Sequence, residues 1–113
     1  MKIGLVSDTH GDRKQMERAL ALLKGTDHLL HAGDLYRDTL WMRHHFAGPV
    51  TGVIGNGDPS ESGPSQRLLE LDRIKILLSH GHIQRVQRSL THLYYLGLEQ
   101  EAQVVVFGHT HIP

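Results

Sequence analysis

The chain has 113 residues, of which 39% are apolar, and its 12 basic residues balance its 12 acidic ones. This length fits one small domain, and no apolar run approaches the roughly 20 residues that are needed to cross a bilayer. The balanced charge also argues against a protein that grips nucleic acid through its phosphates, because such proteins need a basic surface.

Short apolar runs alternate with helical patterns along the chain, which is typical of βαβ architecture. In chain order we expect a strand over 3–6, a helix over 12–24, a strand over 28–32, a helix over 38–46 and strands over 50–54, 67–70 and 74–78. A helix over 86–102, with a buried stripe from Val86 to Leu98, and a strand over 103–107 complete the chain. Residues 55–66 predict a loop, and Asp72-Arg73 predicts the tight turn of an antiparallel hairpin.

Histidine is the unusual feature of the composition, with ten residues in a chain that has no cysteine. Histidine together with aspartate suggests a metal site built from imidazole and carboxylate groups. The alternative is a set of surface and packing histidines, and only their placement can decide. No disulfide can form, and the N-terminus lacks a signal-peptide pattern, so we predict a cytoplasmic protein.

Five of the six expected strands lead directly into Asp, Asn or His. These residues are Asp8 and His10, Asp34, Asn56, His80, and His109 and His111. Ligands bind outside the carboxyl ends of the strands in open α/β sheets, so we expect these side chains to converge. A small residue precedes each strand-end group and lets the backbone turn where a ligand must point inward.

The converging set therefore offers seven oxygen and nitrogen ligands: Asp8, His10, Asp34, Asn56, His80, His109 and His111. Seven ligands are too many for one tetrahedral ion. They suit two divalent ions of higher coordination number that share a bridging carboxylate. Such a pair clamps the attacking and leaving oxygens of a displacement at phosphorus and favours a bound hydroxide near neutral pH.

The motifs D-T-H at Asp8, G-D at Gly33, G-N at Gly55, H-G-H at His80 and G-H-T-H at Gly108 resemble, in this order, those of the calcineurin-like metallophosphoesterases. The length and spacing resemble the small bacterial and archaeal phosphodiesterase branch of this family. The resemblance implies a four-layer α-β-β-α sandwich. It also implies hydrolysis of phosphate esters through a metal-bridging hydroxide.

The resemblance further implies a role for each ligand. One ion would be held by Asp8, His10 and His111, the second by Asn56, His80 and His109, and Asp34 would bridge them. Mn²⁺ is the expected ion, with Fe, Zn and Ni as alternatives. Catalysis would involve Asp34, Asn56 and His82, and the substrate phosphate would contact Asn56 and Arg85.

Some of these assignments have alternatives. We favour His80 over His82 as a ligand because His80 lies nearer the strand end, which leaves His82 behind the ligands. For Arg85 we favour a solvated helix face over contact with the substrate phosphate. The remaining histidines are interpreted as surface or packing residues, although His31 could lie beneath the site as an outer-shell partner.

The sequence departs from the family at two places. Gly57 follows Asn56 where many relatives have His or Cys beside the scissile phosphate, which favours a phosphodiesterase over a phosphomonoesterase. Relatives also continue past G-H-T-H through strands that complete a sheet. We therefore interpret residues 1–113 as a metallophosphoesterase domain that lacks its C-terminal strands.

The function expected from the sequence is a two-metal phosphodiesterase that acts on a small phosphate ester, without a membrane partner. The sequence leaves open whether the protein forms a homodimer. The alternative is a non-catalytic, metal-binding scaffold for protein interactions on the same fold, with a retromer subunit as the precedent. Because every ligand position is filled in this sequence, we favour catalysis.

Overall fold

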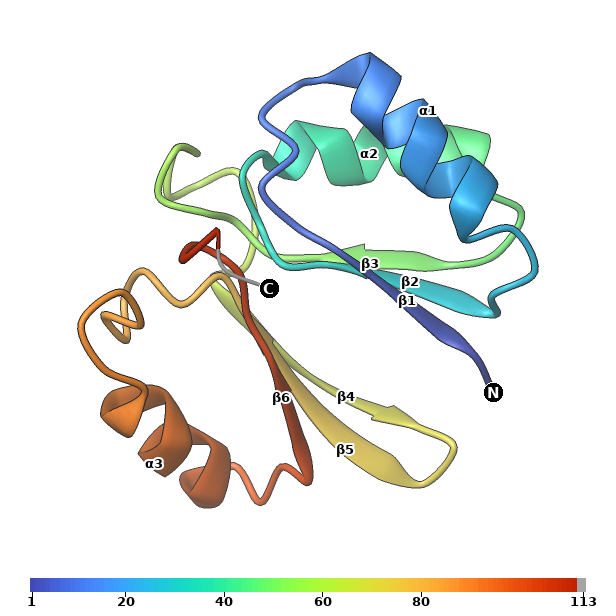
Figure 1. Ribbon diagram of the computed structural model, residues 1–113. Coiled ribbons are helices and arrows are strands. Elements are labelled where there is room, and N and C mark those ends of the chain that lie inside the picture. The colour runs from blue at the N-terminus through green and yellow to red at the C-terminus, as the bar shows by residue number, and fades with distance from the viewer. Residues whose placement is uncertain (112–113) are drawn as a thin grey trace.

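The computed structural model describes residues 1–111 and contains two sheets and three helices (Figure 1). In chain order the elements are β1 (Ile3–Val6), α1 (Arg13–Leu22), β2 (His28–His31), α2 (Tyr36–His45), β3 (Val50–Gly52), β4 (Gln66–Leu71), β5 (Ile74–Ser79), α3 (Thr91–Glu99) and β6 (Val104–Val106). Each expected strand and helix is present, and the bounds of most differ from the expected ones by a few residues.

The two sheets have three strands each, in the orders β1-β2-β3 and β4-β5-β6. All neighbours in the first sheet are parallel, and β5 is parallel to β6 in the second. Only β4 runs antiparallel to its neighbour, through a hairpin whose turn residues Asp72 and Arg73 have φ of 52° and 67°. The predicted hairpin is therefore confirmed, and β4 is the one strand that leads into no predicted ligand.

Three hydrophobic clusters separate four layers, which confirms the predicted α-β-β-α sandwich. Helices α1 and α2 cover the outer face of the first sheet, and α3 covers that of the second (Figure 1). The cluster under α1 and α2 contains Met16, Leu29, Met42 and Val50. The cluster between the sheets contains Leu30, Ala32, Val53, Ile76 and Leu78, and the one under α3 contains Leu77, Val86 and Leu93. Adjacent strand residues alternate between clusters because successive side chains point to opposite faces.

The expected helix over 86–102 is wrong in its first part, because α3 begins only at Thr91. The segment before it forms turns, in which Arg85 adopts a left-handed φ of 56° that a helix does not allow. The Ser89 hydroxyl accepts a hydrogen bond from the Thr91 N–H at 3.1 Å, which satisfies a free N–H at the start of the helix.

The buried stripe expected in this region is also wrong. Val86 and Leu93 pack in the same cluster, but Leu90 and Leu98 are 52% and 55% exposed. The buried residues of α3 are Leu93 and Gly97, one helical turn apart. Val86 reaches the core from a turn rather than from the helix. The spacing of Val86 and Leu93 therefore resembled that of one helix face, although only Leu93 lies in the helix.

No helix within residues 1–111 is long and apolar enough to span a membrane. The cytoplasmic location stays a prediction.

Leu30 and Leu5 are register partners on neighbouring strands, yet Leu30 is fully buried between the sheets and Leu5 is 57% exposed. We expect Leu30→Ala to lower the free energy of unfolding by about 2–5 kcal/mol, because it leaves a cavity in the central cluster. Leu5→Ala should change it by no more than about 0.5 kcal/mol, as exposed substitutions usually do. Urea denaturation of both variants measures the difference. Equal losses would contradict this location of the core.

Candidate metal centre

Loops from both sheets meet at the carboxyl ends of the strands. The N–H groups of Asp8 and His10 donate to the carbonyl oxygens of Gly33 and Asp34 at 2.8 and 3.0 Å. In the second sheet, the Gly108 N–H donates to the His80 carbonyl at 3.2 Å. These bonds fix the loop after each strand to the loop after its neighbour, so the predicted ligands lie on one rigid surface.

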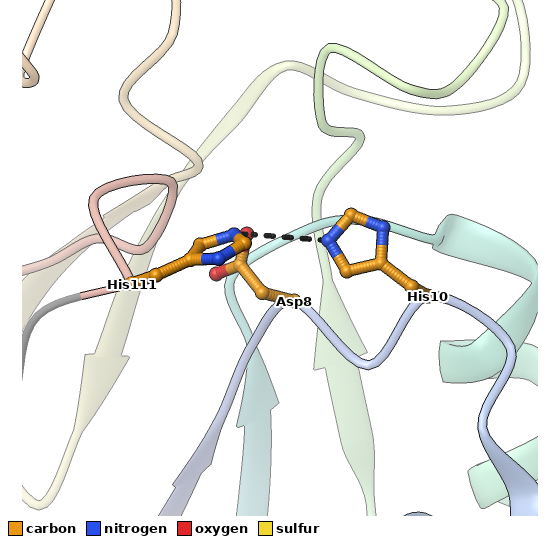
Figure 2. A group of neighbouring side chains, drawn as sticks. All are labelled: Asp8, His10 and His111. Carbon is orange, nitrogen blue, oxygen red and sulfur yellow. Dashed lines mark hydrogen bonds and ion pairs between the residues drawn. The ribbon is translucent and has the colours of Figure 1, made fainter.

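Asp8 links the two sheets. Its Oδ2 accepts a hydrogen bond from the His109 N–H at 3.1 Å, and its Oδ1 lies 3.1 Å from His111 Nε2 and 4.0 Å from His10 Nε2. Figure 2 shows the rings of His10 and His111 beside this carboxylate, although they come from opposite ends of the chain. Burial raises the pKa of Asp8, but hydrogen bonds from Ser7 and His109 outweigh it and hold the pKa below its usual value.

The two carboxylate oxygens of Asp34 also have different partners. Oδ1 accepts a hydrogen bond from the Gly57 N–H at 2.9 Å. Oδ2 faces two imidazoles, at 3.5 Å from His80 Nε2 and 4.0 Å from His10 Nε2. Each carboxylate thus uses one oxygen to bind the backbone and presents the other to histidine rings.

His80 is fully buried, and its ring orientation shows what the cluster lacks. Nδ1 lies 2.7 Å from the Ala32 carbonyl oxygen, so in the neutral ring Nδ1 carries the hydrogen and Nε2 presents a lone pair. Around Nε2 lie Asn56 Oδ1 at 3.1 Å, Asp34 Oδ2 at 3.5 Å and Asp8 Oδ1 at 3.8 Å. One lone pair and three oxygens therefore face a common point, which a cation would satisfy. A ring N–H bonded to a backbone carbonyl is the usual support of a metal-binding histidine.

The donor atoms form two overlapping groups in which all lie within 4.8 Å of one another: Asp8, His10 and His111, and Asp8, Asp34 and His80. The His109 ring lies 4.9 Å from the His80 ring, between centroids. The structure thus brings all seven predicted ligands to one place. Carboxylate oxygen and imidazole nitrogen fit divalent transition metals, so the residues present suit the implied ions. Asp8 is the carboxylate shared by both groups, and the assignment of Asp34 as the bridge stays a prediction.

Backbone strain is concentrated at the same place. Nine non-glycine residues of the described chain have a positive φ, and five of them are predicted ligands: Asp8, His10, Asp34, His109 and His111. A left-handed residue of this kind costs about 1–3 kcal/mol and persists only where the surrounding structure fixes it. Such strain is typical of functional sites, although Asp and His also adopt this conformation more readily than most residues.

Two of the small residues before the ligands are needed for close approach. A β-carbon on Gly55 would overlap the Asp34 carboxylate, and one on Gly108 would lie 2.6 Å from Asp8 Oδ2. Neither glycine has a positive φ. The expectation that these glycines serve to turn the chain is therefore wrong for this pair. They leave room for a carboxylate from another strand.

The other predicted site residues differ in their surroundings. His82 is half-buried, with its ring 5.5 Å from that of His80 and 6.3 Å from that of His109, and its Nδ1 has no hydrogen-bond partner among the described residues. Burial lowers its pKa. Arg85 is exposed in the turns that follow His82, so the favoured placement on a helix face is wrong. Its contact with substrate stays a prediction.

His31 was interpreted from the sequence as a surface or packing residue, with an outer-shell role as the alternative. The structure places it in the core beneath the site, fully buried, with Nε2 2.9 Å from Thr9 Oγ1. Thr9 stands between the predicted ligands Asp8 and His10. The position therefore matches the outer-shell alternative. No pattern in the sequence indicates the buried Asp38 that also contacts Thr9, because Asp38 resembles an ordinary residue of a helix's first turn.

The complete chain, residues 1–113, matches the family model of the calcineurin-like phosphoesterase superfamily domain. The protein belongs to this superfamily. A probable metallophosphoesterase from Bacillus subtilis is 32% identical to this phosphoesterase domain, over 99% of this chain and 65% of the relative. A phosphodiesterase from Methanocaldococcus jannaschii is 28% identical, over 98% of this chain and 74% of the relative.

Among solved structures, a predicted phosphoesterase from Streptococcus pneumoniae superimposes with a TM-score of 0.80 at 31% identity. The match covers 99% of this phosphoesterase domain and 63% of that chain. A single-residue variant of Vps29 from Entamoeba histolytica has a TM-score of 0.79 at 22% identity, over 99% of this chain and 66% of that one, which shows a shared fold alone. The chain thus spans about two thirds of the length of the Bacillus relative and of the Streptococcus protein.

Burial lowers the pKa of His31 to about 4. In the unfolded chain a histidine has a pKa of about 6.5, so below that pH the unfolded state binds a proton that the folded state excludes. Stability should therefore fall as the pH falls from 6.5 to 4, by about 1.4 kcal/mol per pH unit from this group and about 3 kcal/mol in total. We expect His31→Gln to flatten this slope by up to that amount.

Urea unfolding with a chelator present, at half-unit steps of pH, measures both slopes without competition from metal ions. His28→Gln is the matched control, because His28 lies on the same strand and the pKa of its ring is lowered by a lesser burial. Parallel slopes for the wild type and His31→Gln would contradict a neutral, buried His31.

Proposed function

We propose that this domain binds two divalent metal ions and hydrolyses phosphate diesters. One observation carries the proposal: oxygens of Asp8, Asp34 and Asn56 lie 3.1–3.8 Å from Nε2 of the buried His80, whose Nδ1 already contacts the Ala32 carbonyl oxygen. Removing two carboxylates from water without a counter-charge is costly, and a metal ion supplies that charge. The family to which the chain belongs supports the reaction class.

The first ion would be held by Asp8, His10 and His111, the second by Asn56, His80 and His109, and Asp34 would contact both. When bound, such ions polarise phosphoryl oxygens and lower the pKa of a coordinated water. Mixed oxygen and nitrogen donors without thiolate fit Mn²⁺, with Fe, Zn and Ni as alternatives. Oligomeric state and cytoplasmic location stay predictions.

The protein's own groups would act on the substrate around these ligands. Asn56 is exposed, so its amide N–H can donate to a phosphoryl oxygen. His82 lies behind His80 and His109, and because burial lowers its pKa it is neutral near pH 7. A neutral ring can donate or accept one hydrogen bond at that position. Arg85 would add a positive charge for the phosphate from the turns after His82.

Two features support a diester over a monoester. At Gly57 the chain presents only a backbone N–H, bonded to Asp34, where a side chain would be needed to protonate a leaving group. A hollow of about 390 Å³ beside Asn56 and His82, lined also by Ile54, Ser65 and Ile83, offers space for a second ester group. A phosphodiesterase is among the similar proteins, which adds support to the same preference.

The alternative function is a metal-binding scaffold for protein interactions. The likeness to Vps29 concerns the fold alone and does not favour it. A scaffold needs no left-handed ligands around a buried lone pair, whereas a reaction centre gains from fixed donor groups. Measured hydrolysis separates the two functions.

Mn²⁺ loading of the metal-free chain should give close to two equivalents, measured by elemental analysis after removal of free ion. Asp34→Asn should lower binding to about one equivalent or less and remove most diesterase activity, because the bridge would lose its charge. Asp8→Asn is the matched control: the same change in the neighbouring carboxylate should weaken mainly the ion held with His10 and His111. Binding of one equivalent by the wild type would contradict the two-ion site. A larger loss of bound Mn²⁺ and activity in Asp8→Asn than in Asp34→Asn would identify Asp8 as the bridge.

The leaving-group dependence tests the diester preference. Activated aryl diesters should turn over, and alkyl monoesters should be poor substrates, because no side chain at residue 57 protonates the departing oxygen. A β-carbon on Gly57 would lie 3.3 Å from Asp34 Oδ1, so a side chain needs only a small local shift. We expect Gly57→His to raise kcat/KM for alkyl monoesters by about tenfold, below the about 10²–10⁴-fold of an optimised acid.

Gly57→Ala controls for the added β-carbon, since it has no group that can give up a proton. The measurement is kcat/KM across esters that differ in leaving-group pKa. If Gly57→His and Gly57→Ala respond alike across the series, residue 57 does not face the leaving group.

A further inference from the structure

We propose that Asp38 is a positioning residue for the metal centre and acts through Thr9, the residue between the ligands Asp8 and His10. The inference rests on the proposed metal-binding function and extends it to residues that touch no ion. The loop of residues 8–11 presents two ligands, and one buried carboxylate on α2 binds it at two points.

The contacts of Asp38 are short and converge on one oxygen. Its Oδ2 accepts hydrogen bonds from the Thr9 hydroxyl at 2.5 Å and from the Gly11 N–H at 2.8 Å. Residues 9 and 11 flank His10, so the two bonds hold the backbone on both sides of this ligand. Asp38 is 3% exposed, and it lies in the first turn of α2, where a negative charge is favourable.

A second buried residue completes the network from below. The Gly33 N–H donates to His31 Nδ1 at 3.1 Å, so the neutral ring carries its hydrogen on Nε2 and donates it to Thr9 Oγ1 at 2.9 Å. The Thr9 hydroxyl must then donate its own hydrogen to Asp38. Each hydrogen bond in this network therefore has one defined donor, and the Thr9 hydroxyl can adopt only one orientation.

The backbone of the loop explains why such a restraint is needed. Asp8, His10 and Gly11 have φ of 55°, 46° and 78°, so three of four consecutive residues are left-handed. L-residues avoid this region, and the loop keeps the conformation only where other contacts hold it. The side-chain exposure of 51% for His10 shows that core packing does not hold this ligand. Hydrogen bonds to a buried, fixed carboxylate can.

The neighbouring Thr39 supplies a matched control. It lies next to Asp38 on α2 and is fully buried like His31, but its hydroxyl has no hydrogen-bond partner among the described residues. Thr9→Val and Thr39→Val therefore make the same chemical change, and only the first breaks bonds to the loop. Thr9→Ser keeps the hydroxyl and should restore what Thr9→Val removes.

The experiment is calorimetric titration of each metal-free variant with Mn²⁺. We expect Thr9→Val to weaken one of the two binding steps about 10- to 100-fold, the range found when outer-shell partners of metal ligands are removed. Thr9→Ser and Thr39→Val should bind both ions within about threefold of the wild type, well inside that range. His111→Ala identifies the step, because it removes an exposed ligand assigned to the first ion: the same step should weaken in both variants.

Urea unfolding of the metal-free variants separates positioning from general stability. Asp38→Asn is the second variant, and it should weaken the same step by a smaller factor, since an amide oxygen still accepts hydrogen bonds. Unchanged binding in both Thr9→Val and Asp38→Asn, or equal weakening of both steps, would overturn the positioning role. A wild-type chain that binds no Mn²⁺ would instead overturn the metal centre itself.

Discussion

The constraint on which this structure depends is the approach of two carboxylates to one buried imidazole. Asp8 Oδ1 and Asp34 Oδ2 lie 3.8 and 3.5 Å from Nε2 of His80, a residue with no exposed surface. Like charges repel more strongly in such surroundings than in water. A positive ion among these groups would offset that repulsion, and this is the charge that the proposed metal would supply.

Other features of the molecule follow from holding these groups in place. Parallel strands direct their carboxyl ends to one edge, and backbone hydrogen bonds between loops fix each ligand relative to the next strand. Glycine at 55 and 108 leaves room for a carboxylate that arrives from another strand. The strained backbone at five ligands is the local cost, and the three apolar clusters supply the stability that offsets it.

The two halves of the centre differ in how the protein holds them. His80 is oriented by the core and by a backbone carbonyl, whereas the side chains of His10 and His111 are 51% and 59% exposed. The buried half is preorganised by packing and by hydrogen bonds to the backbone. The open half depends on loop hydrogen bonds, which gives Asp38 and Thr9 their proposed importance. An open half also leaves one side of the centre accessible to an ester and to water, as hydrolysis requires.

The sequence by itself determined the strands, which of them lead into predicted ligands, and the hairpin at Asp72. Short apolar runs and turn residues are local signals, so they can be recognised without the tertiary structure. It also determined which seven residues are the predicted ligands, since each follows its strand directly. Only the tertiary structure decided which residues support them. Asp38 carries no local signal, and for His31 the sequence left the outer-shell role as an alternative, because a buried polar residue is recognised only by the partners that folding brings to it. The length of α3 was likewise undecidable, because Val86 reaches the core from a turn and only packing distinguishes that from a helical stripe.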